Sequence, residues 1–135
     1  MGDKMGFLAV IVAAVASFVF GAVYYGVLAK PWMALSGVPV GEDGKPVNSS
    51  DPTPYIVSFI CILLVAGMMR HSFALSGIDT AGKGFLSGLG VGLFFIAPWI
   101  FINTGYSSRP WMLAVIDSGY AVATGAICGL VLTLL

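Results

Sequence analysis

The sequence predicts an all-α polytopic membrane protein, a bundle of four transmembrane helices with a polar loop between the first and second. Its 135 residues are 59% apolar and only 9% charged, against about 25% charged in a typical globular domain. A water-soluble chain of this size could not hide so much apolar surface. The apolar residues also fall into four continuous runs, each close to the ~20 residues needed to cross a bilayer.

The four runs cover about residues 7–29, 54–75, 84–104 and 110–135, and they form one domain over residues 1–135. Only helices and closed barrels can cross a bilayer, because lipid offers the backbone no hydrogen-bond partners. Barrel strands would alternate apolar and polar residues, whereas these runs are continuous, so we expect helices. The first run is longer than a signal-peptide core, and we interpret it as an uncleaved first span.

Residues 30–53 form the one sizeable polar segment, which we interpret as a loop preceded by a short interfacial helix over 31–35. The other connections are short, so sequence neighbours should pack antiparallel. An even number of spans places both termini on the same side of the membrane. The positive-inside rule does not choose that side, and the acidic loop favours cytoplasmic termini. The cations divide evenly, with Lys4, Arg70 and Lys83 on the terminal side and Lys30, Lys45 and Arg109 on the other.

A partial repeat follows the first and third spans. Residues 26–33 and 105–112 both read Gly-x-x-x-cation-Pro-Trp-Met. We expect membrane-interface anchors there, because cations reach headgroups and tryptophan favours the interface. The predicted anchors are Trp32, Trp111 and Arg109, with Arg70 snorkelling from the second span. Either a two-helix unit was duplicated or the same anchor chemistry was selected twice.

Small residues recur at every fourth position in three of the spans, a spacing that marks helix contact faces in bilayers. The second span has no such series. The faces pack the bundle together, or at least one of them, foremost the three-glycine series, serves an oligomer or a partner subunit. The predicted packing residues are Ala13, Ser17 and Gly21 in the first span, Gly84, Gly88 and Gly92 in the third, and Ala121, Gly125 and Gly129 in the fourth.

Asp117 is the polar residue that most needs an explanation. It follows Pro110 by seven residues, roughly 10 Å along a helix, and an acid at that depth is costly unless it is paired or protonated. It either makes a structural hydrogen bond to a neighbouring polar group or contacts an ion or substrate. Its expected neighbours are Tyr24, Tyr25, Asn103, Lys30 and Tyr120.

No reaction signature accompanies these polar groups. The chain has no nucleophile–base pair, no cluster of metal ligands and no phosphate loop, so we expect neither catalysis nor a cofactor. A zero net charge without a basic patch excludes a nucleic-acid partner. Cys61 and Cys128 fall at depths that differ by roughly 16 Å, too far apart for a disulfide, and should be small apolar fillers.

Both ends of the sequence resemble a bacterial membrane family catalogued as domain of unknown function 1761. Residues 21–33, Gly-Ala-Val-Tyr-Tyr-Gly-Val-Leu-Ala-Lys-Pro-Trp-Met, resemble its opening element. Residues 116–120, Ile-Asp-Ser-Gly-Tyr, and the Gly-Ala-Ile-x-Gly at 125–129 resemble its closing elements. Tyr24 stands where the family has Trp, and Ala29 where Gly precedes Lys. The resemblance implies a small bacterial inner-membrane protein without an established activity, and directs interest to Tyr25, Lys30, Trp32, Asp117 and Tyr120.

Two functions are compatible with the sequence. The first is a non-enzymatic structural or accessory subunit that packs against its own copies or against a larger membrane complex of respiratory or photosynthetic type. The surplus of small-residue faces favours it. The second is a small transporter or channel that uses Asp117 in a polar half-cavity near one mouth. A pathway should place polar side chains at successive depths, and only one half of the bundle has them, which favours the subunit.

Overall fold

The computed structural model describes residues 4–135, with side chains from Gly6 onward, so the side chain of Lys4 lies outside the described part. Four helices are long and apolar enough to cross a membrane, Gly6–Val27, Thr53–Ser76, Ala81–Tyr106 and Trp111–Leu134. The described residues include no strand. The prediction of an all-α protein with four candidate spans is therefore confirmed.

The first span ends earlier than predicted, and a short helix follows it. Helix α1 covers Lys4–Val27 and α2 covers Ala29–Ser36. Pro31 cannot donate to the carbonyl of Val27 and its ring clashes with that carbonyl, so the first helix cannot continue. Within α2, Pro31 stands in the first turn, where no intrahelical donor is needed. The predicted interfacial helix over 31–35 is thus two residues longer at its start and one at its end.

The loop over 37–52 has a defined hairpin-like path. The backbone N–H of Gly41 donates to the carbonyl of Lys45, and that of Val47 to the carbonyl of Pro39, both at 2.8 Å. Gly44 sits between them with a φ of +76°, which favours glycine. The loop ends at Asp51, whose carboxylate accepts the N–H of Thr53 at 3.0 Å. Hydrogen bonds from Thr53 hold the pKa of Asp51 below its ordinary value.

Helix α3 covers Thr53–Ser76 and α4 begins at Ala81. The first of these helices ends at Gly77, where a φ of +70° reverses the chain and the N–H bonds to the carbonyl of Phe73. Thr80 then caps the next helix by accepting the N–H of Lys83 at 3.3 Å. These end signals set the span at 53–76, close to the predicted 54–75.

The third span contains a π-helical segment that the sequence analysis did not predict. It consists of α4 (Ala81–Gly90), η1 (Val91–Ile96) and α5 (Ala97–Tyr106). In η1 the N–H of Ala97 reaches back five residues to the carbonyl of Gly92. Pro98 explains the change of register, because it supplies no N–H to the carbonyl four residues before it. The span runs over 81–106 instead of the predicted 84–104.

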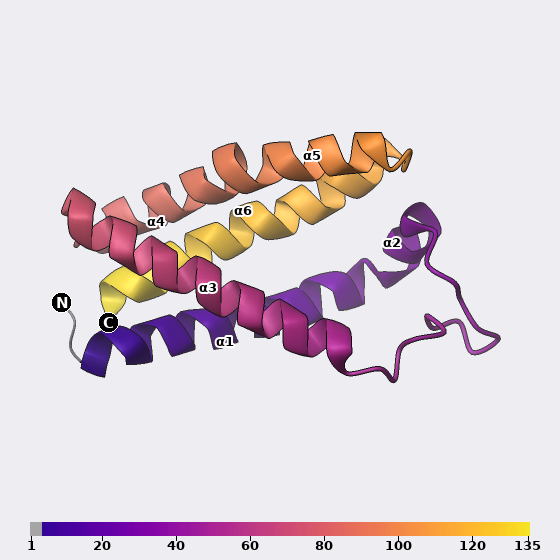
Figure 1. Ribbon diagram of the computed structural model, residues 1–135, viewed down its shortest axis with the longest axis horizontal. Coiled ribbons are helices and arrows are strands. Elements are labelled where there is room, and N and C mark those ends of the chain that lie inside the picture. The colour runs from indigo at the N-terminus through magenta and orange to yellow at the C-terminus, as the bar shows by residue number, and fades with distance from the viewer. Residues whose placement is uncertain (1–3) are drawn as a thin grey trace.

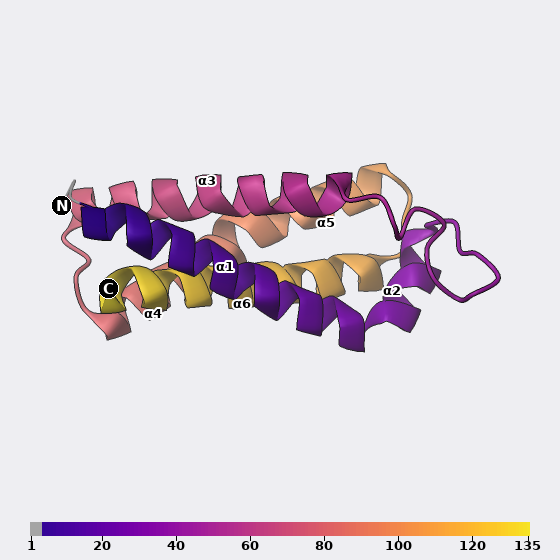
Figure 2. The same ribbon diagram turned by 90° about the horizontal axis from the view of Figure 1, so that it is seen from below.

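Helix α6 (Trp111–Leu134) is the centre of the bundle. It packs against every other helix, while α3 packs mainly against α1. Figure 1 shows it lying between α4–α5 on one side and α1 on the other. The start of α1 and the end of α6 share one end of the bundle, and the 37–52 loop projects from the opposite end (Figure 2).

The best-packed apolar core lies towards the end where the chain starts and finishes. It is built from α1, α3 and α6 and consists of Ala9, Ala13, Ala66, Met69, Phe73, Cys128 and Leu132. Cys128 is fully buried in it, and Cys61 is exposed. Both thiols are free. Each of the three helices contributes at least one small residue, Ala9 and Ala13 from α1, Ala66 from α3 and Cys128 from α6, which lets the helices approach closely.

Helices α4 and α6 touch through their backbones. A Cβ atom at Gly84 would overlap the carbonyl oxygen of Gly129, and one at Gly88 would overlap that of Gly125. Gly92 stands in the same way against the carbonyl of Ala121. The two small-residue series therefore contact each other within the chain. The alternative in which the three-glycine face binds an oligomer partner would require this contact to open.

We predict that Gly88→Ile separates α4 from α6 and lowers the free energy of unfolding by about 1–3 kcal/mol, the usual cost of overpacking. Gly90→Ile is the matched control, since beyond its chain neighbours and its own helix backbone no atom lies within 4 Å of the missing Cβ at Gly90. Thermal unfolding of the purified protein in detergent measures the difference. Equal midpoints for the two variants would contradict the α4–α6 contact.

Candidate functional site

Aromatic side chains from the end of α1 meet the first half of α6. Tyr24 donates its hydroxyl to the backbone carbonyl of Ile116 at 2.7 Å. The hydroxyl oxygen lies 2.5 Å from the position that a Cβ atom would take at Gly119. Any larger residue at position 119 would therefore displace Tyr24 from α6.

The opposite contact is made by Tyr120, which reaches from α6 to α1. Its hydroxyl donates to the backbone carbonyl of Ser17 at 3.2 Å. The same hydroxyl lies 2.8 Å from where a Cβ atom would stand at Gly21. In each helix, therefore, one tyrosine hydroxyl donates to a backbone carbonyl of the other helix. Each tyrosine also packs over a glycine of the opposite helix. We call this the reciprocal tyrosine contact.

Asp117 lies beside the reciprocal tyrosine contact and accepts two hydrogen bonds. The hydroxyl of Tyr25 donates to its Oδ1 at 2.7 Å, and Nε1 of Trp32 donates to the same oxygen at 3.2 Å. The carboxylate therefore joins three helices, α6 through Asp117 itself, α1 through Tyr25 and α2 through Trp32. The other oxygen, Oδ2, accepts no bond among the described residues and is not fully buried.

The aromatic rings pack edge to face around Tyr25. Its ring centre lies 5.2 Å from that of Tyr24, 5.3 Å from that of Tyr120 and 6.0 Å from that of Trp32, at interplanar angles of 82°, 64° and 76°. Such pairs contribute about 0.5–1.5 kcal/mol each beyond their burial. These residues define the tyrosine–carboxylate cluster: Tyr24, Tyr25, Trp32, Asp117 and Tyr120.

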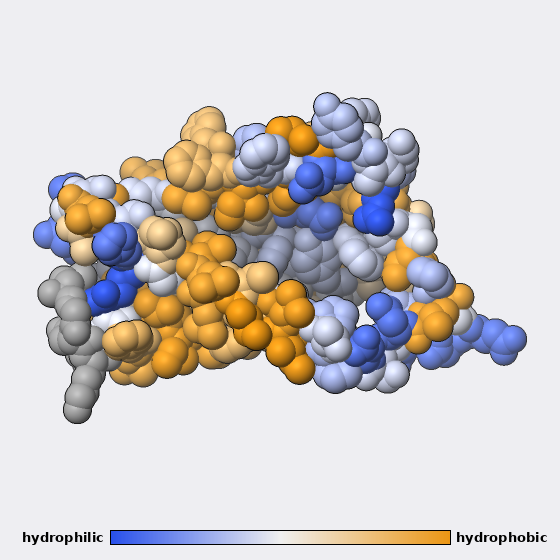
Figure 3. All heavy atoms as spheres, in the orientation of Figure 1, coloured by the Kyte–Doolittle hydropathy of each residue, from blue (hydrophilic) through white to orange (hydrophobic). Residues whose placement is uncertain are grey.

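The surface of the molecule is hollowed on one face. Figure 3 shows a recess in the loop-end half of the molecule, bounded by α5 and α6 above and by α1 and α3 below. Pale, weakly polar atoms line it, whereas strongly hydrophobic atoms cover the other half of this face. All five residues of the cluster are partly exposed, so the cluster is not closed off from the molecular surface.

A line of polar residues continues from the cluster along α6. Asp117, Tyr120, Thr124 and Cys128 follow one another at intervals of three and four residues, which places them on one helix face. The line reaches α1 again where Ser17 Oγ and Cys128 Sγ lie 3.1 Å apart, both side chains fully buried. Cys128 belongs to the apolar core, so the line starts in the loop-end part of α6, passes the middle of the helix and ends six residues before Leu134.

Of the predicted partners of Asp117, the structure brings Tyr25 to it directly and Tyr120 to the adjoining ring contact. Lys30 and Asn103 are exposed and form no hydrogen bond or ion pair with Asp117 among the described residues. Asn103 is turned away because η1 shifts the register of α5 by one residue, which puts the buried Thr104 on the inner side instead.

The two copies of the Gly-x-x-x-cation-Pro-Trp-Met repeat build different structures. Trp111 is 61% exposed, stacks on Phe101 at 6.2 Å and covers Gly105. Trp32 instead turns inward to Asp117, and nothing fills the corresponding space at Gly26. Trp111 and the exposed Arg109 have the outward placement expected of interface anchors. Trp32 does not.

Arg70, the remaining predicted anchor, is only partly exposed. Its guanidinium lies against Gly6, so closely that a Cβ atom at position 6 would overlap it. The side chain therefore packs across the start of α1. This contact joins α3 to α1 at the chain-terminal end of the bundle.

Sequence reasoning missed two features of the cluster. It assigned Trp32 to the membrane interface, because tryptophan near a span end is explained by the aromatic belt. It also overlooked the pairing of Tyr24 with Gly119 and of Tyr120 with Gly21. The signal for this pairing is a glycine beside or three residues before a tyrosine in two distant spans, a pattern that becomes informative only once both spans are known to meet.

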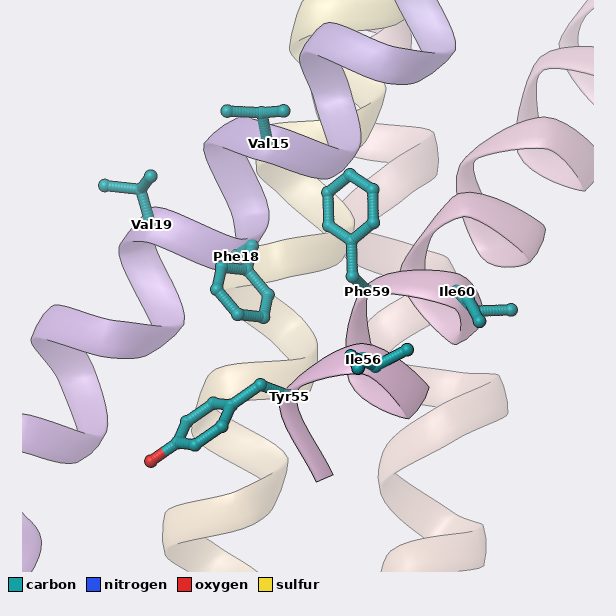
Figure 4. Close-up of a pocket in the computed structure, with 7 residues that line it drawn as sticks. All are labelled: Val15, Phe18, Val19, Tyr55, Ile56, Phe59 and Ile60. Atoms are coloured by element: carbon teal, nitrogen blue, oxygen red, sulfur yellow. The ribbon is translucent and has the colours of Figure 1, made fainter. Parts of the chain in front are cut away.

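A groove elsewhere on the described surface is apolar. It has a volume of about 470 Å³ between α1 and α3, where Phe18 and Phe59 pack edge to face at 5.9 Å. Figure 4 shows its lining residues, Val15, Phe18, Val19, Tyr55, Ile56, Phe59 and Ile60. Tyr55 brings the one polar side-chain atom, so the groove offers no set of groups for chemistry.

The fold and the cluster define an integral membrane protein with four candidate spans, built around a carboxylate that joins three of its helices. Among the described residues, no three His, Cys, Asp or Glu side chains gather where they could hold a metal ion. The chain belongs to the family described as protein of unknown function, DUF1761, which it matches over residues 8–133. No protein of curated function and no solved structure shows significant similarity to it.

We predict that Tyr25 and Asp117 are energetically coupled. Asp117→Asn keeps size and hydrogen bonding and should fold with little loss, whereas Asp117→Leu strands the Tyr25 hydroxyl and the Trp32 N–H and should destabilise the fold by about 1–3 kcal/mol. In a double-mutant cycle, adding Tyr25→Phe to Asp117→Leu should cost at least about 0.5 kcal/mol less than adding it to the wild type. Unfolding in denaturant measures the four stabilities.

The control for this cycle is Tyr55→Phe, at a tyrosine that is 57% exposed and forms no hydrogen bond among the described residues. It should add the same small effect in both backgrounds. Additive effects of Tyr25→Phe and Asp117→Leu would show that the 2.7 Å hydrogen bond contributes nothing measurable.

Proposed function

We propose that the protein is a small non-enzymatic subunit of the bacterial inner membrane, which associates with its own copies or with a larger complex of respiratory or photosynthetic type. The observation that carries this proposal is how its polar groups are used. Tyr24, Tyr25, Trp32 and Tyr120 all donate to groups of the chain itself. This pattern supports a role in holding helices together.

A surface for the partner is offered by η1 and α5. Phe94 and Phe95 are each 71% exposed and Trp99 is 64% exposed. With Pro98 and Ile102 they surround a shallow groove of about 390 Å³. Outward side chains of a span contact either lipid or a neighbouring helix, and helices in lipid associate through close packing. Because the small-residue faces of α4 and α6 contact each other, the proposal places the partner on this aromatic surface.

Native mass spectrometry of gently extracted protein tests the proposal. We expect the wild type as an oligomer or bound to other subunits, and we expect a Phe95→Ala, Trp99→Ala double variant to lose most of that assembly. A Leu64→Ala variant is the control, since Leu64 is 67% exposed on α3. A wild-type protein that is monomeric and without partners in native membranes, cross-linked before extraction, would overturn the subunit proposal.

A second candidate, a small transporter or channel, is favoured by one observation. Asp117 lies within a span and begins a line of polar side chains that reaches Cys128. Intramembrane acids with such neighbours often belong to ion or proton pathways. Against it, the line meets the apolar core at Cys128, so a pathway would need Leu132 and Phe73 to separate.

Reconstituted vesicles distinguish the two candidates. The subunit proposal predicts no proton or cation current above that of protein-free vesicles, measured with a pH-sensitive dye under an imposed potential. The transporter candidate predicts a current that Asp117→Asn abolishes, since this variant keeps hydrogen bonding and loses the titratable proton. Asp79→Asn, in the exposed α3–α4 connection, is the matched control. A wild-type current lost only in Asp117→Asn would replace the first proposal by the second.

A further inference from the structure

The Asp117 carboxylate has hydrogen bonds but no counter-charge. Its two partners, the Tyr25 hydroxyl and the Trp32 indole, are neutral donors on one oxygen. No described lysine, arginine or histidine forms an ion pair with it. A carboxylate inside a span is neutralised by a proton or by a cation. Since Oδ2 is not fully buried and has no partner among the described residues, a cation has an oxygen to bind.

The groups around Asp117 suit one class of cation. Ca²⁺ takes about six to eight oxygen ligands, whereas the cluster supplies one carboxylate. The hydroxyls of Tyr24, Tyr25 and Tyr120 already donate to protein oxygens. Besides the carboxylate, the cluster contains aromatic rings that are partly exposed, and ring faces attract alkylammonium groups.

Partial exposure gives such a group access to the cluster. Asp117 and Tyr24 are each partly exposed at the molecular surface. Asp117 lies about two helical turns from the start of α6 at Trp111, which is roughly 9 Å along the helix. A headgroup at the bilayer interface or a small amine from the aqueous side can approach to that depth.

We propose that Asp117 Oδ2 and the rings of the tyrosine–carboxylate cluster form a binding site for an organic ammonium group. The group belongs either to a lipid headgroup of the phosphatidylethanolamine type or to a free alkylammonium ion. Asp117 supplies the charge, and Tyr24, which is partly exposed at the rim of the cluster, supplies a ring face. Trp32 reports occupancy, because its indole nitrogen lies 3.2 Å from the same carboxylate. This site is independent of the subunit role proposed above.

The test uses the full chain carrying Trp99→Phe and Trp111→Phe, so that Trp32 is the single fluorescent tryptophan. The protein is placed in nanodiscs of phosphatidylglycerol and titrated with tetramethylammonium chloride, with sodium chloride at equal ionic strength as the reference. We expect a saturable change in Trp32 emission with tetramethylammonium only. Absence of any such change would overturn the proposal and leave a proton as the sole counter-charge.

Repeating the titration in nanodiscs that also contain phosphatidylethanolamine separates the two sources. A lipid headgroup that occupies the site competes with tetramethylammonium, so the midpoint should rise by about tenfold or more when headgroups are abundant. An unchanged midpoint identifies free alkylammonium ions as the ligand. Both results support an ammonium site and differ only in what fills it.

Single substitutions test which residues form the ammonium site. Asp117→Asn should abolish the titration, and Asp79→Asn in the exposed connection should leave it unchanged. Tyr24→Leu should weaken binding by about tenfold, in line with a cation–π contribution of 1–2 kcal/mol, whereas Tyr24→Phe keeps the ring and should retain it. If Asp117→Asn does not fold, the comparison of Tyr24→Leu with Tyr24→Phe still tests the site. Equal tetramethylammonium binding by these two variants would contradict a contact with the Tyr24 ring.

Discussion

The direct backbone contact between α4 and α6 is the constraint on which the rest of the bundle depends. Helices in lipid gain little from hydrophobic burial and associate through close packing, so a contact free of side chains is the strongest that this chain offers. Gly84 and Gly88 meet Gly129 and Gly125 there. Once α6 is held on that face, its neighbouring face, with Tyr120 and Cys128, is presented to α1.

The carboxylate of Asp117 is connected to the way the chain leaves the first span. Pro31 stops α1, and the turn at Leu28 redirects the chain into α2. That redirection brings Trp32 back against α6, where its indole N–H reaches Asp117. A continuous first helix would carry Trp32 past the cluster. The proline break and the intramembrane acid are therefore parts of one arrangement, even though 85 residues separate Trp32 from Asp117.

Much of this was predictable because apolar runs and four-residue spacings are properties of single helices. The spans, the small-residue faces and the need of Asp117 for a polar neighbour follow from them. Which neighbour it finds does not, because that depends on how the helices are rotated against one another. Asn103 and Tyr25 looked equally suitable in the sequence. Only Tyr25 faces α6, since the rotation of α5 is set by a hydrogen-bond shift at η1 that leaves no periodic signal.

The π-helical segment changes which residues of the third span face the interior of the bundle. In a continuous α-helix the buried series Gly84, Gly88, Gly92 would proceed to Ile96 and then to Asn103, whereas the structure buries Ala97 and Thr104. The two arrangements differ by one residue, a rotation of about 100°. Pro98 holds the span in the observed phase. Pro98 therefore determines which polar side chain is buried farther along α5. The hydroxyl of Thr104 lies inside the protein, and the amide of Asn103 lies outside it.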